Sequence, residues 1–174
     1  MKEWIELALS CGFTHAVPIA PEKLQPMEAV RDMCRADKCR AYGKNWTCPP
    51  ACGTLEHCAE VLHSYGRGLL LQTVGTLSKA IDTRGYAAAE QAHREAMAAF
   101  TPEIRKAFPN ALCLGAGGCR VCKECAYPDP CRFPEKAISS MEAYGLFVTQ
   151  VCRDHELPYH YGSGTITYCG CVLF

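Results

Sequence analysis

The chain has 174 residues, with 18 basic and 18 acidic side chains and therefore a formal net charge of zero. Hydrophobic residues make up 49% of the sequence and charged residues 21%, which is typical of a folded globular protein and excludes a disordered chain. The balanced charge disfavours a general nucleic-acid binder, which needs a basic excess, and no apolar run approaches the roughly 20 residues of a membrane helix. We therefore expect a single domain over residues 1–174 with neither nucleic acid nor a membrane as a partner.

In chain order, segments with helical spacing alternate with short apolar or alternating runs. The sequence predicts helices over residues 2–11, 21–33, 55–66, 86–100 and 135–155, and strands over 13–19, 69–74, 111–114 and 165–174. Thr54 is a residue typical of a helix N-cap, and Thr101-Pro102 predicts the end of the helix before it. This order predicts an α/β fold, or the related α+β class, with a small and mostly central sheet of about four strands packed with helices.

Cysteine is the outlier of the composition, with 14 residues that mostly crowd into two loops, 34–58 and 113–134. The central parts of both loops lack any hydrophobic period, and prolines such as Pro49-Pro50 and Pro128 exclude a helix there. The acidic N-terminus does not resemble a signal peptide, and a domain of this length does not need disulfides for stability. We therefore expect a cytoplasmic protein whose thiolates bind metal in preference to forming disulfides.

The loop 113–134 contains the more specific pattern. Cys119, Cys122 and Cys125 form a C-x2-C-x2-C run, and Cys131 follows after five residues. A run of this type places three thiolates at the corners of one iron–sulfur cubane, with a more distant cysteine as the fourth ligand. The last gap is two residues longer than in bacterial ferredoxins, and the stiff segment 127–130 is able to absorb the excess. These four cysteines are the predicted ligands of a [4Fe–4S] cluster, with a tetrahedral zinc site as the alternative.

The loop 34–58 predicts a second metal site, with the pattern Cys34-x4-Cys39-x8-Cys48-Pro49-Pro50-x-Cys52 and thus four thiols within 19 positions. Cys34, Cys39 and Cys48 are expected ligands, and Cys52 is the expected fourth. If Cys52 points away, one iron is open to a substrate. The basic side chains around the loop either offset the charge of an anionic cluster or form a solvated surface; they are Arg31, Arg35, Lys38, Arg40 and Lys44.

The remaining cysteines and the histidines carry weaker signals. Four cysteines fall on apolar stripes or strands, where core packing is the expected role; they are Cys11, Cys58, Cys113 and Cys152. Cys169 and Cys171 share one face of the last strand, where they either pack in the core or flank a metal. The six histidines show no metal-ligand spacing, so satisfied core or surface positions are expected for them.

No other motif predicts a reaction. The glycine-rich Gly115-Ala116-Gly117-Gly118 follows a predicted strand, as a dinucleotide-binding loop does, but it leads into a cysteine turn and not into a helix. Walker, nucleophile-elbow and paired-carboxylate motifs are absent from the sequence.

The residues around the cysteines form a spaced combination that extends over residues 34–145. Its parts are Cys34-x4-Cys39-x2-Tyr42-Gly43-Lys44-Asn45-Trp46-Thr47-Cys48-Pro49-Pro50, Gly118-Cys119-x2-Cys122-x2-Cys125, Cys131-Arg132-Phe133-Pro134-Glu135-Lys136-Ala137 and Ser140-Met141-Glu142-Ala143-Tyr144-Gly145. This combination resembles a largely uncharacterised prokaryotic family described only as predicted metal-binding proteins. The resemblance implies metal binding, with iron–sulfur as the expected form, and supplies no reaction. Cys169-Gly170-Cys171 lies outside it.

The sequence thus predicts an iron–sulfur protein with two [4Fe–4S] clusters that acts in intracellular electron transfer, or as a redox accessory protein, together with a redox partner protein. Two other functions stay open. One is an enzyme that uses the open iron of a cluster on a small substrate, and the other is a zinc-binding structural or trafficking protein. The sequence indicates neither the oligomeric state nor the identity of the partner.

Overall fold

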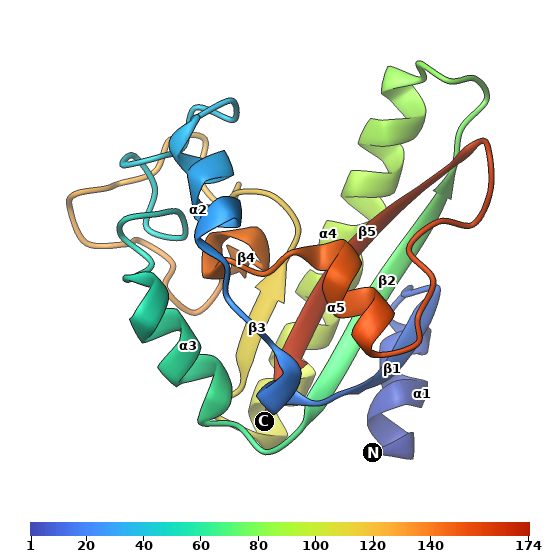
Figure 1. Ribbon diagram of the computed structural model, residues 1–174, viewed down its shortest axis with the longest axis horizontal. Coiled ribbons are helices and arrows are strands. Elements are labelled where there is room, and N and C mark those ends of the chain that lie inside the picture. Colours follow the sequence, from blue (N-terminus) through green and yellow to red (C-terminus); the bar gives the residue numbers. More distant parts are fainter.

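A mixed five-stranded sheet organises the computed structural model, which describes residues 1–174 (Figure 1). The strands are β1 (His15–Ile19), β2 (Gly68–Thr76), β3 (Leu112–Gly115), β4 (Ser139–Ser140) and β5 (Thr165–Leu173). They lie in the order β1-β2-β5-β3-β4. The long antiparallel pair of β2 and β5 forms the centre, and only β3 and β4 pair in parallel.

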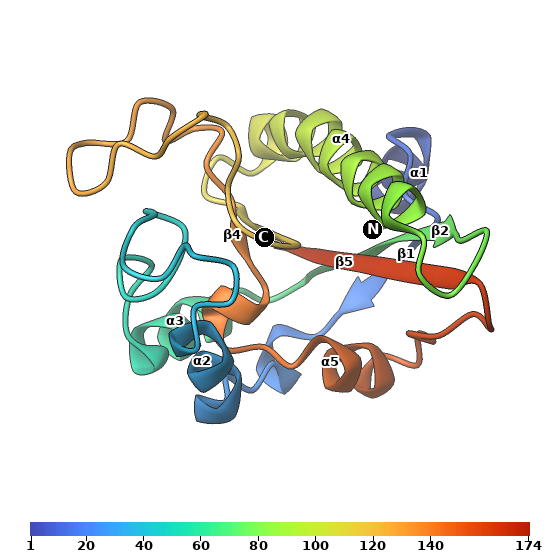
Figure 2. The same cartoon turned by 90° about the horizontal axis from the view of Figure 1, so that it is seen from above.

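Helices cover both faces of the sheet, as Figure 2 shows. One face carries α1 (Lys2–Ser10) and α4 (Thr83–Ala107). The other face carries α2 (Glu28–Arg35), α3 (Leu55–His63), α5 (Val148–Asp154) and the 3-10 turns η1 (Pro21–Lys23) and η2 (Glu142–Tyr144). None of the helices combines the length and the apolar character that crossing a lipid bilayer requires. The α/β class expected from the sequence is confirmed, with five strands in place of about four.

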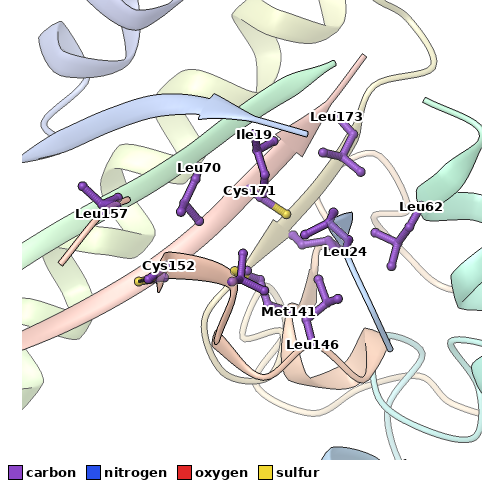
Figure 3. Close-up of a cluster of buried hydrophobic side chains, with 13 residues drawn as sticks. Ile19, Leu24, Leu62, Leu70, Met141, Leu146, Cys152, Leu157, Cys171 and Leu173 are labelled. Carbon is purple, nitrogen blue, oxygen red and sulfur yellow. Dashed lines mark hydrogen bonds between the residues drawn. The ribbon is translucent and has the colours of Figure 1, made fainter. Parts of the chain in front are cut away.

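Alternation along the central strands produces one buried cluster on each face of the sheet. The cluster beneath α4 contains Phe100 and Ile104 of that helix together with strand residues Leu69, Leu71 and Val172. The opposite cluster, drawn in Figure 3, contains Cys152 of α5 together with Leu70, Cys171 and Leu173. The expected alternation of the last strand is therefore present, since Cys171 and Val172 face opposite layers.

Two prolines shift helix boundaries relative to the sequence prediction. The helix expected over residues 21–33 is divided into η1 and α2, because Pro26 has no N–H group and favours an extended residue before it. The helix expected to stop at Thr101-Pro102 continues through Pro102 to Ala107. Buried residues of α4 lie on both sides of this proline, and their burial offsets the missing hydrogen bond.

A glycine accounts for the third difference. Of the helix expected over residues 135–155, only α5 is helical, and the chain before it forms β4 and η2. Gly145 ends η2 with a φ of 77°, in the left-handed region. A Cβ at this position would lie 2.4 Å from Leu55 Cδ1, so the close approach of α3 also requires glycine. The predicted N-cap of α3 is confirmed, because the Thr54 hydroxyl accepts a hydrogen bond from the His57 N–H at 3.2 Å.

The contact between β2 and β5 leaves no room for a side chain at the start of β2. A Cβ at Gly68 would lie 2.3 Å from the Val172 carbonyl oxygen, whereas a Cβ at Gly66 would meet nothing within 4 Å. We expect Gly68→Ala to lower the free energy of unfolding by about 2 kcal/mol, and the matched Gly66→Ala to change it by less than about 0.5 kcal/mol. Urea unfolding measures both, and equal losses in the two variants would contradict the strand packing.

His93 is buried between α4 and the sheet, with 1% of its surface exposed. Its Nδ1 lies 3.0 Å from Thr73 Oγ1, and its Nε2 has no hydrogen-bond partner. Burial, with a smaller contribution from the Arg94 cation, lowers the pKa of His93 from 6.5 to about 4. The folded protein therefore holds this imidazole in its neutral form at neutral pH.

Because of this lowered pKa, we expect the free energy of unfolding to decrease in mild acid, before the carboxylates titrate fully. Between pH 6.5 and about 4 the unfolded chain binds a proton at His93 that the folded chain does not bind. The free energy of unfolding should therefore decrease by about 3 kcal/mol as the pH falls through this window. Urea unfolding at several pH values measures the decrease. A His93→Gln variant should lack this component, and an identical pH dependence in both proteins would refute it.

Candidate metal centre

The two cysteine loops lie side by side at one end of the molecule, as Figures 1 and 2 show. Three consecutive residues of the first loop make the contact. The Asn45 side-chain amide donates to the Cys119 carbonyl oxygen at 3.4 Å, the Trp46 indole N–H donates to the Asp129 carbonyl oxygen at 2.8 Å, and the Thr47 hydroxyl accepts from the Cys119 N–H at 3.3 Å. The Trp46 ring also packs edge-on against Tyr127, with centroids 5.0 Å apart. The loops are therefore one structural unit, although the residues that join them are 72 to 83 positions apart along the chain.

The four cysteines predicted in the second loop surround one small pocket. Cys119, Cys122, Cys125 and Cys131 are all half-buried, and all four line a pocket of about 20 Å³. Asn45, Trp46 and Thr47 of the first loop close the pocket from the other side. The structure thus directs these four thiols to a common space.

The backbone around this pocket has free hydrogen-bond donors. None of the N–H groups of residues 120–127 finds a backbone acceptor, and residues 116–138 contain no helix or strand. Such N–H groups are suited to thiolate and sulfide acceptors, whose charge they stabilise. The second loop therefore offers both thiols and donors around the same space.

The first loop gathers its thiols more loosely. Cys48 is buried, Cys34 and Cys52 are half-buried, and Cys39 is exposed. Cys34 and Cys52 both reach the turn η2, where their Sγ atoms lie 3.9 Å from the Glu142 carbonyl oxygen and 3.5 Å from the Ala143 carbonyl oxygen. The arrangement places Cys52 against η2 and the base of α3.

Electrostatics links the first loop to the second. Burial raises the pKa of Cys48 to about 11, and the neighbouring thiols of Cys39, Cys34 and Cys119 act in the same direction. Burial, followed by the Glu142 carboxylate and the Cys39 thiol, also raises the pKa of Cys34. These thiols need an additional positive charge to become thiolates at neutral pH, and a metal supplies such a charge.

Arg31 is the buried cation of the region, and the sequence did not single it out from its basic neighbours. It is 6% exposed, and its Nη2 donates to the Gly53 carbonyl oxygen at 2.9 Å and to Cys58 Sγ at 3.2 Å. The Cys58 thiol lies 3.7 Å from the Cys52 carbonyl oxygen, and the neighbouring Cys52 side chain, with help from Arg31, lowers the pKa of Cys58 to about 7. Cys58 is buried as expected, but it is also part of the charged network of the first loop.

The other basic side chains of the first loop lie on its outer surface. Arg35 is half-exposed and pairs with Glu28 and Asp32, and Lys44 lies 3.9 Å from Asp37. Only Arg31 among the five therefore contacts a cysteine sulfur.

The structure does not assemble a complete coordination sphere. No group of three or more His, Cys, Asp or Glu side chains is arranged to hold a metal ion, and all 14 cysteines are free thiols. The donor set of the second loop nevertheless fits a soft metal or an iron–sulfur cluster, because four cysteines line one pocket in a segment whose N–H groups lack backbone acceptors.

The remaining cysteines belong to the two cores. Cys113, Cys152, Cys169 and Cys171 are buried, and Cys11 is half-buried beside the α4 cluster. Cys152 Sγ lies 3.7 Å from Cys169 Sγ and accepts a hydrogen bond from the Gln72 side chain at 3.4 Å. Histidines also hold structural positions: His155 Nε2 accepts from the Ala20 N–H at 3.0 Å, and His63 Nε2 lies 2.8 Å from the Leu24 carbonyl oxygen.

Comparison with known proteins identifies the family. Residues 17–174 match the model of the domain of unknown function DUF2284, described as a predicted metal-binding protein. The chain belongs to the DUF2284 family. No curated protein and no solved structure matches it significantly. Membership in DUF2284 confirms the resemblance seen in the sequence and supports metal binding, and both cysteine loops lie inside the matched region.

The contact between the loops predicts a local effect of changing Trp46. Trp46→Ala removes both the hydrogen bond to Asp129 and the ring contact with Tyr127, so the second loop should open more often. We expect tryptic cleavage after Lys123 and Arg132 to become severalfold faster, with Trp46→Phe intermediate because it keeps a ring. Ile81→Ala, which changes an exposed apolar residue outside both loops, is the control. Equal cleavage rates in all four proteins would show that the loops are independent.

Proposed function

We propose that this DUF2284 protein holds two [4Fe–4S] clusters and transfers electrons inside the cell. The second loop would bind one cluster through Cys119, Cys122, Cys125 and Cys131, and the first loop would bind the other through Cys34, Cys39, Cys48 and Cys52. Each cluster supplies reversible one-electron chemistry when bound.

The observation that carries the proposal is the shared pocket of the four thiols in the second loop. A structural zinc site usually joins two separated C-x2-C turns, whereas three cysteines at successive three-residue steps suit the corners of a cubane. The unpaired N–H groups of residues 120–127 add to this preference, because hydrogen bonds to cluster sulfurs raise the potential and offset the anionic charge.

The first loop contributes the second site and its link to the first. Cys48 is close enough to Cys34, Cys39 and Cys119 for their charges to affect its ionisation. Cys119 is a predicted ligand of the other cluster, so Cys48 lies where the two sites approach each other. Such proximity favours electron passage between two clusters and onward to a redox partner protein. A reducing compartment such as the cytoplasm suits a chain with 14 free thiols.

A second candidate function rests on the position of Cys52. Its sulfur lies 3.5 Å from the Ala143 carbonyl oxygen of η2 and beside Cys58, on the α3 side of the first loop. If Cys52 does not bind iron, the first cluster has an open iron that acts as a Lewis acid on a small substrate. The chain would then be an enzyme and not a carrier.

The decisive experiment is metal and sulfide analysis of anaerobically purified protein. Two cubanes require about eight irons and eight acid-labile sulfides per chain, with the absorption and paramagnetic resonance of [4Fe–4S] centres. Replacing Cys122 and Cys125 by Ala should remove about half of both, whereas Cys113→Ala, a buried core cysteine, should leave the counts unchanged. Stoichiometric zinc without sulfide would overturn the proposal in favour of a structural or trafficking role.

Cys52→Ala separates the carrier from the open-site enzyme. A carrier with four cysteine ligands should lose or degrade its first cluster, and the iron count should fall by about four. An open-site enzyme should keep that iron. Cys171→Ala is the control for a cysteine in the sheet core.

A further inference from the structure

A cleft of about 750 Å³ separates α4 from the start of the second cysteine loop and the chain just after that loop. One wall is α4, and the other comes from residues 115–121 and from Glu135, Lys136 and Ile138. The volume lies in the range of small-molecule sites. Cys119 and Val121 line both this cleft and the small cysteine pocket, so the two spaces are neighbours.

Three acidic and three basic side chains line the cleft, and two of the basic ones, Arg94 and Arg120, lie together beside the single carboxylate of Glu90. Arg94 Nη2 lies 2.7 Å from Glu90 Oε1, and Arg120 Nη2 lies 3.4 Å from the same oxygen. Two guanidinium groups thus share one carboxylate. The Arg120 side chain is 71% exposed, so it can turn toward a ligand at little conformational cost.

The glycine-rich segment after β3 adds backbone donors beside these arginines. The N–H groups of Ala116, Gly117 and Gly118 find no backbone acceptor. Arg94 Nη1 donates to the Gly118 carbonyl oxygen at 3.1 Å, which holds the segment against α4. Gly117 has a φ of 69°, and a Cβ there would lie 3.3 Å from Arg94 Nη2. Successive free N–H groups beside a left-handed residue form a concave site for anions.

The rest of the cleft is lined by both apolar and polar residues. Met97, Ala98 and Pro102 of α4 and Ile138 after the second loop give it apolar surface, and Thr101, Glu135 and Lys136 also line it. A ligand whose charged group lies at Gly117 and Arg120 therefore also meets hydrocarbon between Met97 and Ile138.

We propose that this cleft binds a small organic anion, with a carboxylate or phosphate group at Gly117, Gly118 and Arg120 and an apolar body between Met97 and Ile138. Binding itself follows from the cleft and does not depend on which metal the loops hold. That the bound anion lies beside a metal centre rests on the proposed function, because the connection runs through Cys119.

Calorimetric titration of the anaerobically purified protein with benzoate and with phenyl phosphate tests the proposal. These probes share an aromatic body and differ in the anionic group, and benzyl alcohol is the neutral counterpart. We expect saturable binding of at least one anion with a Kd of about 1 mM or lower, and none of the alcohol at that concentration. The preferred anion distinguishes a carboxylate site from a phosphate site. Binding of neither anion up to about 10 mM, or equal binding of the alcohol, would overturn the proposal.

Variants locate the site in the cleft. Arg120→Gln removes an exposed cation, and Gly117→Ala places a methyl group beside the free N–H groups. Each should weaken anion binding about threefold to tenfold. Arg84→Gln, on α4 but outside the cleft, is the matched control and should leave the Kd unchanged. A loss as large in Arg84→Gln as in Arg120→Gln would show nonspecific charge attraction and overturn the site.

Two further measurements keep this inference separate from the proposed function. Anion binding should persist after chelation of the metal, whatever that metal is. In metal-loaded protein, the preferred anion should shift the spectrum of the centre, and Arg120→Gln should require a higher anion concentration for the same shift. If the anion binds without any change in the spectrum, the anion does not lie beside the metal, but the cleft is still its binding site.

Discussion

The contact of Asn45, Trp46 and Thr47 with the second cysteine loop is the interaction on which the candidate site depends. Residues 36–54 and 116–138, which hold most of the loop cysteines, contain no helix or strand, so neither stretch is ordered by a regular backbone ladder. Hydrogen bonds to the backbone of Cys119 and Asp129 place the second loop relative to the first. The same three residues close the pocket that the four thiols line.

Charge explains why the region suits a metal. Many thiols share a small volume with one buried cation, Arg31, and that cation is directed to Cys58 and Gly53 and not to the shared pocket. Ionising several of these thiols together is costly without more positive charge, as the raised pKa values of Cys34 and Cys48 indicate. Metal binding by these thiols would therefore be coupled to their deprotonation.

The sequence predicted the sheet better than it predicted the helices. The strands depend on alternation, which is local, and all four predicted strands are present within a few residues. The two-residue strand β4 is too short to leave a pattern. The helix errors arise at Pro26, Pro102 and Gly145, where the outcome depends on what packs against the residue. Pro102 is tolerated because α4 rests on the sheet, and Gly145 is needed because α3 lies close.

For the site, spacing identified which cysteines share a loop but not how the loops meet. The contact through Trp46, the role of Arg31 and the link between Cys52 and Cys58 are all tertiary. No sequence pattern predicts the cleft beside Cys119, since its walls come from α4 and from two other segments, one at the start of the second loop and one just after it. The glycine-rich segment is visible in the sequence. Its proposed role in binding an anion, however, depends on the neighbouring arginines, which only the fold brings to it.

The parallel pairing of β3 with β4 fixes both ends of the segment that holds the second group of cysteines. Leu114 pairs with Ser139 and Gly115 with Ser140, so residues 116–138 leave and re-enter the sheet at adjacent points. A conformational change within this segment requires no change in strand pairing, and its cost in chain entropy is limited because the two ends are already held together. The sheet is thus able to keep its pairing while the segment between β3 and β4 adopts another conformation.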